Sequence, residues 1–306
     1  VNLINPHDVM YYNTDLPGQT QQSAGAMMHL NKEPNSALYA KQWDVGLPDS
    51  RNQPFQDPDR PNAHLNFRNS RGALCGVVPN KDDNLRRLNN YYFNCLRDVD
   101  DKLVKILDQL DDLGVTDNTI IMFTADHGEL GGAHGLTGKG ANAYREQNNV
   151  PFILAHPGLE GGKKCQAVTS HVDIATTLLS LSGGNEKVSQ GLPGKDLSSL
   201  LQDPEAAPVD ALRTGALYNF NMFGFVDEAF FLSVGKYFAE GGNPKELPSQ
   251  GFRPDLNKRG AIRSIFDGKY KFNRYFSPLQ HHVPKTMEQL FATNDLELFD
   301  VESDPL

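Results

Sequence analysis

The residues best suited to chemistry lie in one stretch, where a carboxylate and an imidazole directly follow an apolar run. Residues 119–125 are mostly apolar or β-branched, as in a strand buried on both faces. Ligands in open α/β sheets lie beyond the carboxyl ends of such strands. Asp126 and His127 can bind a metal ion there, and Lys139 adds a positive charge for an oxyanion. The pattern indicates a metal-assisted attack on an anionic ester.

Asp126 and His127 can reach one ion only if the chain bends after Ala125, because adjacent residues of an extended strand point to opposite faces. Gly128 makes such a bend easy. The alternative is structural: Asp126 caps a turn, and His127 is a turn residue whose hydrogen bonds are satisfied. The dipeptide alone does not decide between the two, but the glycine-rich loop that follows favours the metal site.

Three further residues are candidates, each with a plain alternative. Lys139 lies between two glycines, which allows a close approach to a ligand, although most lysines are solvated. His134 can protonate a leaving oxygen, or it is a loop histidine without function. His7 follows a predicted strand at residues 1–5. If that strand is parallel to the one before Asp126, the two residues share a sheet edge.

Composition sets broad limits on the class of protein. The chain has 306 residues, 39% hydrophobic and 22% charged, which suits one large domain or a large and a small one. A net charge of −9 argues against nucleic-acid binding but allows a local positive site. No run is long enough to span a bilayer. The three cysteines lack metal-site spacing and do not predict a disulfide framework.

The elements that position these residues follow from periodicity. Apolar residues spaced by three and four predict a helix over 82–113, with Cys95 on its buried face and Gly114 as its stop. A short turn then leads into the 119–125 strand. A second strand at 151–155 and a helix from Ser170 to Leu181 repeat the unit. We therefore expect an α/β fold with a mostly parallel sheet flanked by helices.

The remaining segments are less regular. Residues 11–80 are polar and predict long loops with short elements. Their basic residues Arg68 and Arg71, like Arg86 and Arg87, are expected to form a solvated face. Ser170 or Asp173 is expected to cap the helix that follows, and His171 to pack locally.

The carboxyl-terminal part has a different character. Aromatic strands are predicted within 220–231, and Asp267-Gly268 predicts a hairpin between alternating strands. Residues 296–300 predict a further strand. We expect two domains, 1–205 with the α/β fold and 206–306 as a smaller antiparallel α+β subdomain.

The combination Asp126-His127-Gly128, His134-Gly135 and Gly138-Lys139-Gly140 resembles the sulfatases of the alkaline phosphatase superfamily. The resemblance extends to other segments, and it covers most of the chain apart from the loops at 11–70 and 205–258. These segments are Asn5-Pro6-His7, Val99-Asp100-Asp101, residues 171–179, the hairpin at 267–271 and residues 297–300.

The resemblance implies roles for the candidates. Asp126 and His127 would be two ligands of one divalent ion, in most sulfatases Ca²⁺, with Mg²⁺ or Mn²⁺ as other options. Lys139 and His7 would be catalytic, Lys139 by binding the sulfate, and His134 would contact substrate. The substrate would be a small-molecule or carbohydrate sulfate ester. We expect no nucleic-acid partner and no membrane-spanning segment.

One departure from the family pattern is large. Sulfatases use a Cys or Ser in a Cys/Ser-x-Pro-x-Arg motif, converted to formylglycine, as nucleophile, and no segment of this chain matches it. In the family, that motif and two further acidic metal ligands precede the Asn5-Pro6-His7 strand. We therefore expect the chain to be the carboxyl-terminal part of a sulfatase, inactive alone, with localisation signals elsewhere.

The function predicted is sulfuric ester hydrolysis by a metal-assisted formylglycine nucleophile outside this segment. The nearest alternative is a phosphonate monoester or phosphodiester hydrolase of the same superfamily, which shares the Asp-His-Gly and the lysine. An alternative of another class is a non-catalytic binding protein with a sulfatase-like scaffold.

Overall fold

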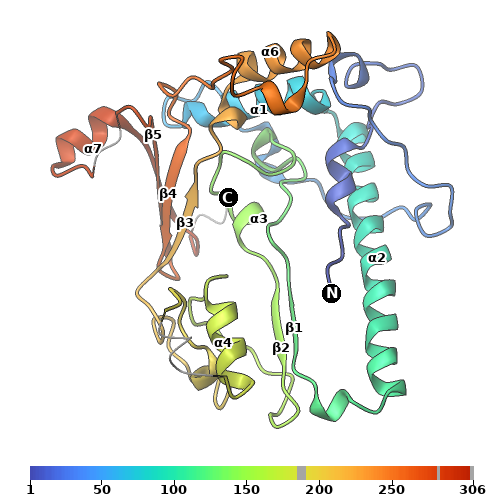
Figure 1. Ribbon diagram of the computed structural model, residues 1–306, viewed down its shortest axis with the longest axis vertical. Coiled ribbons are helices and arrows are strands. Elements are labelled where there is room, and N and C mark those ends of the chain that lie inside the picture. The colour runs from blue at the N-terminus through green and yellow to red at the C-terminus, as the bar shows by residue number, and fades with distance from the viewer. Residues whose placement is uncertain (185–190, 281–282, 304–306) are drawn as a thin grey trace.

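A long amphipathic helix, α2 (Asp82–Asp112), runs along one side of the molecule (Figure 1). The structure, a computed structural model, describes residues 1–184, 191–280 and 283–303. Helix α2 confirms the helix predicted over 82–113, and Cys95 is fully buried on it as expected. The short helix η4 (Thr116–Asn118) connects α2 to the strand that leads to the candidate site.

The sheet at the candidate site is antiparallel. Strand β1 (Ile121–Thr124) pairs with β2 (Phe152–Ala155), which confirms both predicted strands but not a parallel arrangement. No parallel pair of strands occurs within the described ranges. Every residue of β1 is only half-buried, so the expectation of a strand buried on both faces is wrong for this chain. The reason is that, among the residues that the structure describes, β1 has a neighbouring strand on one side only.

The amino-terminal residues do not form the predicted strand. Residues 1–5 are irregular and lead into the 3₁₀ helix η1 (His7–Tyr11), so the strand prediction is wrong. Helix η1 packs against α2 through Val9. His7 therefore begins a helix on the face of α2 and does not end a strand of a sheet.

The segment predicted to be loops contains a 14-residue helix, α1 (Asn62–Cys75). Several of its inward-facing residues are polar, including His64, Ser70 and Arg71, which hides the apolar period from a sequence reading. Two short 3₁₀ helices, η2 (Ser23–Gly25) and η3 (Asp49–Asn52), precede it.

The carboxyl-terminal part forms a four-stranded antiparallel sheet in the order β3-β4-β5-β6. Its strands are β3 (Ala216–Phe220), β4 (Ala261–Phe266), β5 (Tyr270–Phe276) and β6 (Asn294–Asp300). Strands β4 and β5 confirm the predicted hairpin, with Gly268 at φ +104° in its turn. The aromatic stretch 220–231 was expected to be strands, but most of it forms η7 (Phe223–Val226) and the start of α6 (Glu228–Ala239).

The remaining helices are short, and they complete the described elements. They are η5 (Ala133–Gly135), α3 (Arg145–Asn148), α4 (Asp173–Leu181), η6 (Ser198–Leu200), η8 (Pro244–Glu246) and α7 (Met287–Thr293). Helix α4 confirms the predicted helix after Ser170. No helix of the described chain is long and apolar enough to cross a bilayer.

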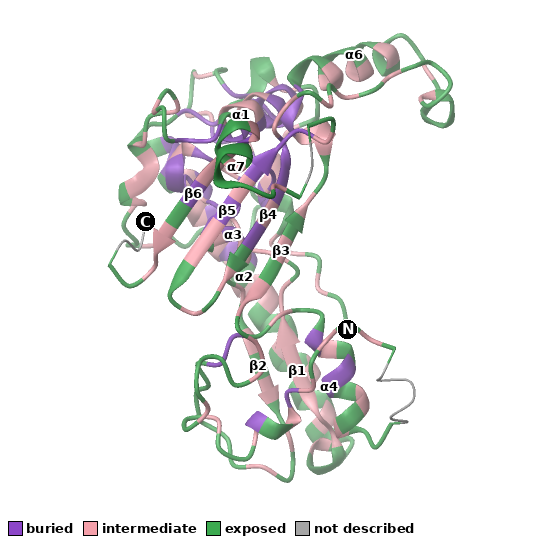
Figure 2. Ribbon diagram, turned by 90° about the vertical axis from the view of Figure 1, so that its left-hand side faces the viewer, coloured by how far each residue is buried: buried purple, intermediate pink, exposed green. Residues whose placement is uncertain are grey.

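The main buried cluster joins the two halves of the chain. Figure 2 shows buried residues concentrated around α1 and the four-stranded sheet, whereas β1, β2 and α4 are mostly half-buried or exposed. Phe67 of α1 and Tyr144 share this cluster with Ile262 and Tyr275 of the sheet. The division of the chain at residue 205 stays a prediction, and the core described here lies across it.

Candidate active site

The chain bends sharply where β1 ends, and close backbone packing causes the bend. The amide of Gly128 donates a hydrogen bond to the carbonyl oxygen of Gln147 at 2.8 Å. A Cβ atom at Gly128 would lie 1.9 Å from the carbonyl oxygen of Glu146, so only glycine fits beside α3. This bend is the one that the sequence required for Asp126 and His127 to face the same point.

Asp126 and His127 are brought together. The Nε2 atom of His127 lies 3.4 Å from Oδ2 of Asp126. The Nδ1 atom of His127 lies 2.9 Å from the carbonyl oxygen of Gly128, which holds the tautomer with its proton on Nδ1. The Nε2 atom faces the carboxylate. The Asp126 side chain is 86% exposed and the His127 side chain 34%, so a ligand has access to both.

The loop after Asp126 is closed by its own hydrogen bonds. Oε1 of Glu129 accepts hydrogen bonds from the amides of Gly131 and Gly138, which lie at opposite ends of the loop. The amide of Leu130 donates to the carbonyl oxygen of Gly138 at 3.0 Å. Lys139 is thereby held close to the end of β1.

Lys139 lies within electrostatic reach of the Asp126–His127 pair. Burial lowers the pKa of its ammonium, and the charge of Arg71 lowers it further, while the Glu129 and Asp126 carboxylates act in the opposite direction. Within the described residues, the Lys139 side chain makes no hydrogen bond and no ion pair. A half-buried ammonium without a partner is suited to an anionic ligand.

His134, predicted to contact substrate, is an interior residue with 2% of its surface exposed. Its imidazole stacks on Tyr144, and its Nδ1 atom lies 2.8 Å from Oε1 of Gln53. The backbone takes a φ of +56°, and the amide donates to Oγ of Ser50 at 3.1 Å. The structure thus separates His134 from the solvent-accessible pair, and a direct substrate contact stays a prediction.

His7 is exposed, and it is linked to the Lys139 loop only indirectly. Nη2 of Arg71 donates a hydrogen bond to the carbonyl oxygen of Met10, in the same short helix as His7, at 3.4 Å. The Arg71 side chain also lies against Gly138. In the described chain, no hydrogen bond or ion pair joins His7 to Asp126 or Lys139.

A buried network of polar side chains contacts the loop that carries His134 and Lys139 from its interior side. The sequence analysis did not predict this network. Nε2 of His64 lies 3.0 Å from the hydroxyl of Tyr275, which donates a 2.9 Å hydrogen bond to Glu297. Arg60 donates to the carbonyl oxygen of His134 at 2.7 Å. Burial lowers the pKa of His64 well below its usual range and raises the pKa of Glu297. No local signal could have found these partners, because they lie far apart in the sequence.

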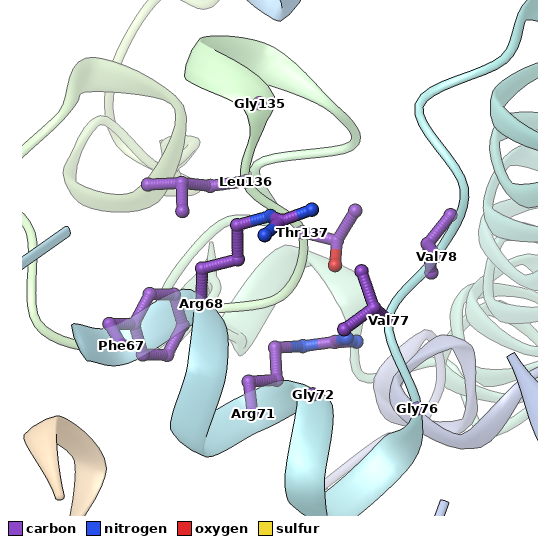
Figure 3. Close-up of a pocket in the computed structure, with 10 residues that line it drawn as sticks. All are labelled: Phe67, Arg68, Arg71, Gly72, Gly76, Val77, Val78, Gly135, Leu136 and Thr137. Atoms are coloured by element: carbon purple, nitrogen blue, oxygen red, sulfur yellow. The ribbon is translucent and has the colours of Figure 1, made fainter. Parts of the chain in front are cut away.

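A small pocket lies beside the Lys139 loop. Arg68 and Arg71 of α1 line it together with Thr137, Val77 and Val78 (Figure 3). Arg71 is only 7% exposed, so the expectation that it belongs to a solvated face is wrong. The sequence predicted loops in this region. Arg71 points inward because it lies on helix α1, which the sequence did not predict.

Comparison of the chain with known proteins identifies the family whose sequence pattern it matches. Residues 1–184 match the family model described as Sulfatase. The chain is 31% identical over 154 residues to the endo-4-O-sulfatase of Bacteroides thetaiotaomicron, covering 50% of this chain and 30% of that protein. It is 36% identical over 121 residues to the ulvan-active sulfatase of Formosa agariphila, covering 39% of this chain and 23% of that protein. The chain spans less than a third of either relative.

Solved structures show the same fold. A 2-O GAG sulfatase superposes with a TM-score of 0.61 and 18% identity, over 98% of this chain and 51% of that one. A structure in complex with its substrate D-glucosamine-2-N,6-O-disulfate superposes with a TM-score of 0.52 and 20% identity, over 75% of this chain and 38% of that one.

Proposed function

This chain belongs to the sulfatase family, and on that premise we propose that the whole protein hydrolyses a sulfate ester. The observation that carries the proposal is the geometry at the end of β1. A bent Asp126–His127 pair lies open to solvent, and the ammonium of Lys139, which has no partner among the described residues, lies within electrostatic reach of Asp126. The nucleophile is proposed to be a formylglycine outside this segment.

Each residue has a chemical task in the proposal. Lys139 stabilises negative charge on the sulfuryl oxygens, because a half-buried ammonium interacts with an oxyanion more strongly than a solvated one. His7, exposed at the start of η1, donates a proton to the leaving oxygen. His134 acts by holding its loop against Tyr144, and a contact with substrate would require the loop to open.

Asp126 and His127 are proposed to hold one divalent ion, which when bound polarises the sulfuryl oxygens. The pair fits this role, since an Asp126 carboxylate oxygen and Nε2 of His127, two atoms that can bind a metal ion, lie 3.4 Å apart. The described residues contain no group of three potential ligands, so the other ligands would come from elsewhere in the protein. We propose Ca²⁺, with Mg²⁺ and Mn²⁺ as the ions to compare. An imidazole ligand favours Mn²⁺ more than an all-oxygen shell does.

The proposed substrate is a carbohydrate sulfate ester. Support comes from the sulfated sugar named in one structural neighbour and from the names of the relatives. We also propose that β1 belongs to a larger, mostly parallel sheet in the whole protein. The support is that the apolar β1 is half-exposed, and that Val104 and Leu107 on the nearby α2 are exposed as well.

The test is a parallel assay of the full-length protein on an aryl sulfate and an aryl phosphonate. Lys139→Ala and Asp126→Ala should each abolish most turnover of the sulfate, whereas Lys164→Ala, an exposed lysine outside the site, should not change it. Faster turnover of the aryl phosphonate than of the aryl sulfate would favour the alternative function, phosphonate monoester hydrolysis. Undiminished turnover in both site variants would refute the roles given to these residues.

A further inference from the structure

The pocket beside the Lys139 loop is built from three separate segments. Arg68 and Arg71 come from α1, Val77 and Val78 from the segment after it, and Thr137 from the loop (Figure 3). The segment after α1 and the loop enclose the arginines. The pocket therefore presents two guanidinium groups and one hydroxyl between apolar walls.

Arg71 is a buried cation for which the described part of the chain supplies no carboxylate partner. Only 7% of the residue is exposed, and it donates a hydrogen bond to the carbonyl oxygen of Met10 at 3.4 Å. No acidic side chain of the described residues forms an ion pair with it. Burying a charge that is not paired is costly, so proteins rarely keep one without a use.

Arg68 adds a second guanidinium to the same pocket. It lies over the ring of Phe55, with its Cζ atom 5.3 Å from the ring centroid, and it also has no acidic partner among the residues described. The hydroxyl of Thr137 makes no hydrogen bond within the described chain. All three groups can therefore donate hydrogen bonds to an anion.

The pocket is directly adjacent to the proposed sulfate site. A Cβ atom at Gly138 would lie 2.5 Å from Nε of Arg71, so the arginine is packed against the residue that precedes Lys139. The like charges of Arg71 and Lys139 lie close enough to lower the pKa of the lysine. Of the nearby carboxylates, Glu129 already accepts hydrogen bonds from the loop amides. The cluster thus has excess positive charge.

We propose that this pocket binds a second anionic group, a carboxylate or a further sulfate, on the same molecule that carries the scissile sulfate ester. Guanidinium groups form paired hydrogen bonds to both kinds of oxyanion. Arg71 and Arg68 are then specificity residues that select doubly charged substrates. This inference rests on the proposed function of the neighbouring site.

The experiment measures kcat/KM of the full-length protein on three sugars. They are a neutral monosulfated sugar, the same sugar with a second sulfate, and a monosulfated uronic acid. The unmodified protein should prefer one or both dianionic sugars, and Arg71→Met and Arg68→Gln should reduce that preference about 10–100-fold, as expected for lost hydrogen bonds to a charged group. The loss should appear mainly as a higher KM for the dianionic sugars.

Arg86→Met is the matched control. It removes the same charge from an exposed position on α2 and should leave the preference intact. Arg68 is only half-buried, so Arg68→Gln carries the test if Arg71→Met does not fold. If the arginine variants lose more of their preference for the uronic acid, the second group is a carboxylate. If they lose more of their preference for the disulfated sugar, it is a sulfate.

A calorimetric titration with the monosulfated sugar and with both dianionic sugars tests the pocket independently of turnover. Failure of the proposed function would appear as no hydrolysis of any sugar, while tighter binding of a dianionic sugar by the unmodified protein than by Arg71→Met or Arg68→Gln would still support the pocket. Equal affinity for the monosulfated and dianionic sugars, or an unchanged preference in both arginine variants, would overturn the inference.

Discussion

The imidazole of His134 lies flat against the phenol ring of Tyr144, with the ring centroids 3.5 Å apart and the planes 2° from parallel. This contact joins the glycine-rich loop to the core, because Tyr144 also packs with residues of the four-stranded sheet. The hydroxyl of Tyr144 lies 3.3 Å from Nδ1 of the buried His64. The loop that carries Lys139 is therefore supported from the interior.

Tyr144→Ala should destabilise the protein by about 3–5 kcal/mol, because it removes a large buried ring and the stack on His134. Tyr144→Phe keeps the ring and loses only the hydroxyl contact, which should cost about 0.5–1.5 kcal/mol. Denaturant unfolding of both variants measures the difference. Equal losses would mean that the hydroxyl, and not the ring stack, supports the loop.

Gly138→Ala should lower the catalytic efficiency of the site more than Gly162→Ala, which places an alanine at a similar backbone angle away from the site. Gly138 has φ +79°, and a Cβ there would push Arg71, whereas Gly162 has φ +80° and nothing within 4 Å. Both alanine variants carry a backbone strain of about 1–2 kcal/mol. Only Gly138→Ala should also lower kcat/KM for a sulfate ester, by about 100-fold, since small displacements of catalytic groups are expensive.

The two variants are compared in the full-length protein by unfolding and by steady-state kinetics. If Gly162→Ala lowers kcat/KM as much as Gly138→Ala does, the effect comes from general strain, and the contact between Arg71 and the loop is not important for the site.

Asp126→Asn and His127→Gln should each weaken divalent-ion binding. A direct ligand should matter more than an outer-shell partner, whose loss typically costs about 10–100-fold in affinity. Calorimetry of the full-length protein with Ca²⁺, Mg²⁺ and Mn²⁺ measures the effect. Asp108→Asn, an exposed acidic residue on α2, provides the control and should bind as the unmodified protein does. Unchanged affinity in both site variants would remove the metal role from this pair.

Much of the local structure could be predicted from the sequence. The three-and-four spacing over 82–113 predicted α2, and the Asp267-Gly268 turn predicted the β4–β5 hairpin. Both are local signals, because the residues that create each pattern lie within one element. The sequence also indicated that Gly128 makes a bend after Ala125 easy, and the structure has Asp126 and His127 in contact there, whereas their role as metal ligands stays a prediction.

The failures concern relationships between distant segments. The β-branched composition of β1 indicates a strand, but it does not specify the direction of the neighbouring strand, and that strand proved antiparallel. Helix α1 was missed because polar residues such as His64 and Arg71 face inward and interrupt the apolar period. Their partners, Tyr275 and Met10, lie 211 and 61 residues away, beyond any spacing rule.

Stability should rise with pH between about 8 and 9.5 because of Lys271. Burial lowers the pKa of this lysine to about 8 from an ordinary value of 10.5. Between these values the unfolded chain holds the proton and the folded chain does not, so the unfolding free energy increases with pH. Below pH 8 both states are charged and the contribution is constant. The upper limit avoids the ordinary titration of tyrosine near pH 10.

The comparison is made by denaturant unfolding at several pH values. Lys271→Met should flatten the rise, whereas Lys245→Met, at an exposed lysine, should keep it. A rise of the same slope in Lys271→Met would show that another group titrates in this range.

The ion pair between Asp173 and Arg213 should be the most sensitive contact near α4. Asp173 is fully buried, accepts hydrogen bonds from the amides of Ser170 and Lys195, and pairs with Nη1 of Arg213 at 2.7 Å. The N-cap of α4 is Val172 and no side chain caps the described helix, so the expected capping by Ser170 or Asp173 is wrong. Arg213→Met leaves a buried carboxylate without its cation, which typically costs about 3–5 kcal/mol.

Two comparisons show whether charge is the cause. Glu240→Gln breaks an exposed pair with Lys236 and should change the unfolding free energy by less than about 1 kcal/mol. Adding Asp173→Asn to Arg213→Met should recover part of the loss, because the neutral amide no longer needs a cation, although its single oxygen can accept only one of the two backbone hydrogen bonds. A double variant as unstable as the sum of the single variants would show that the two side chains act independently, and that Arg213 contributes through packing.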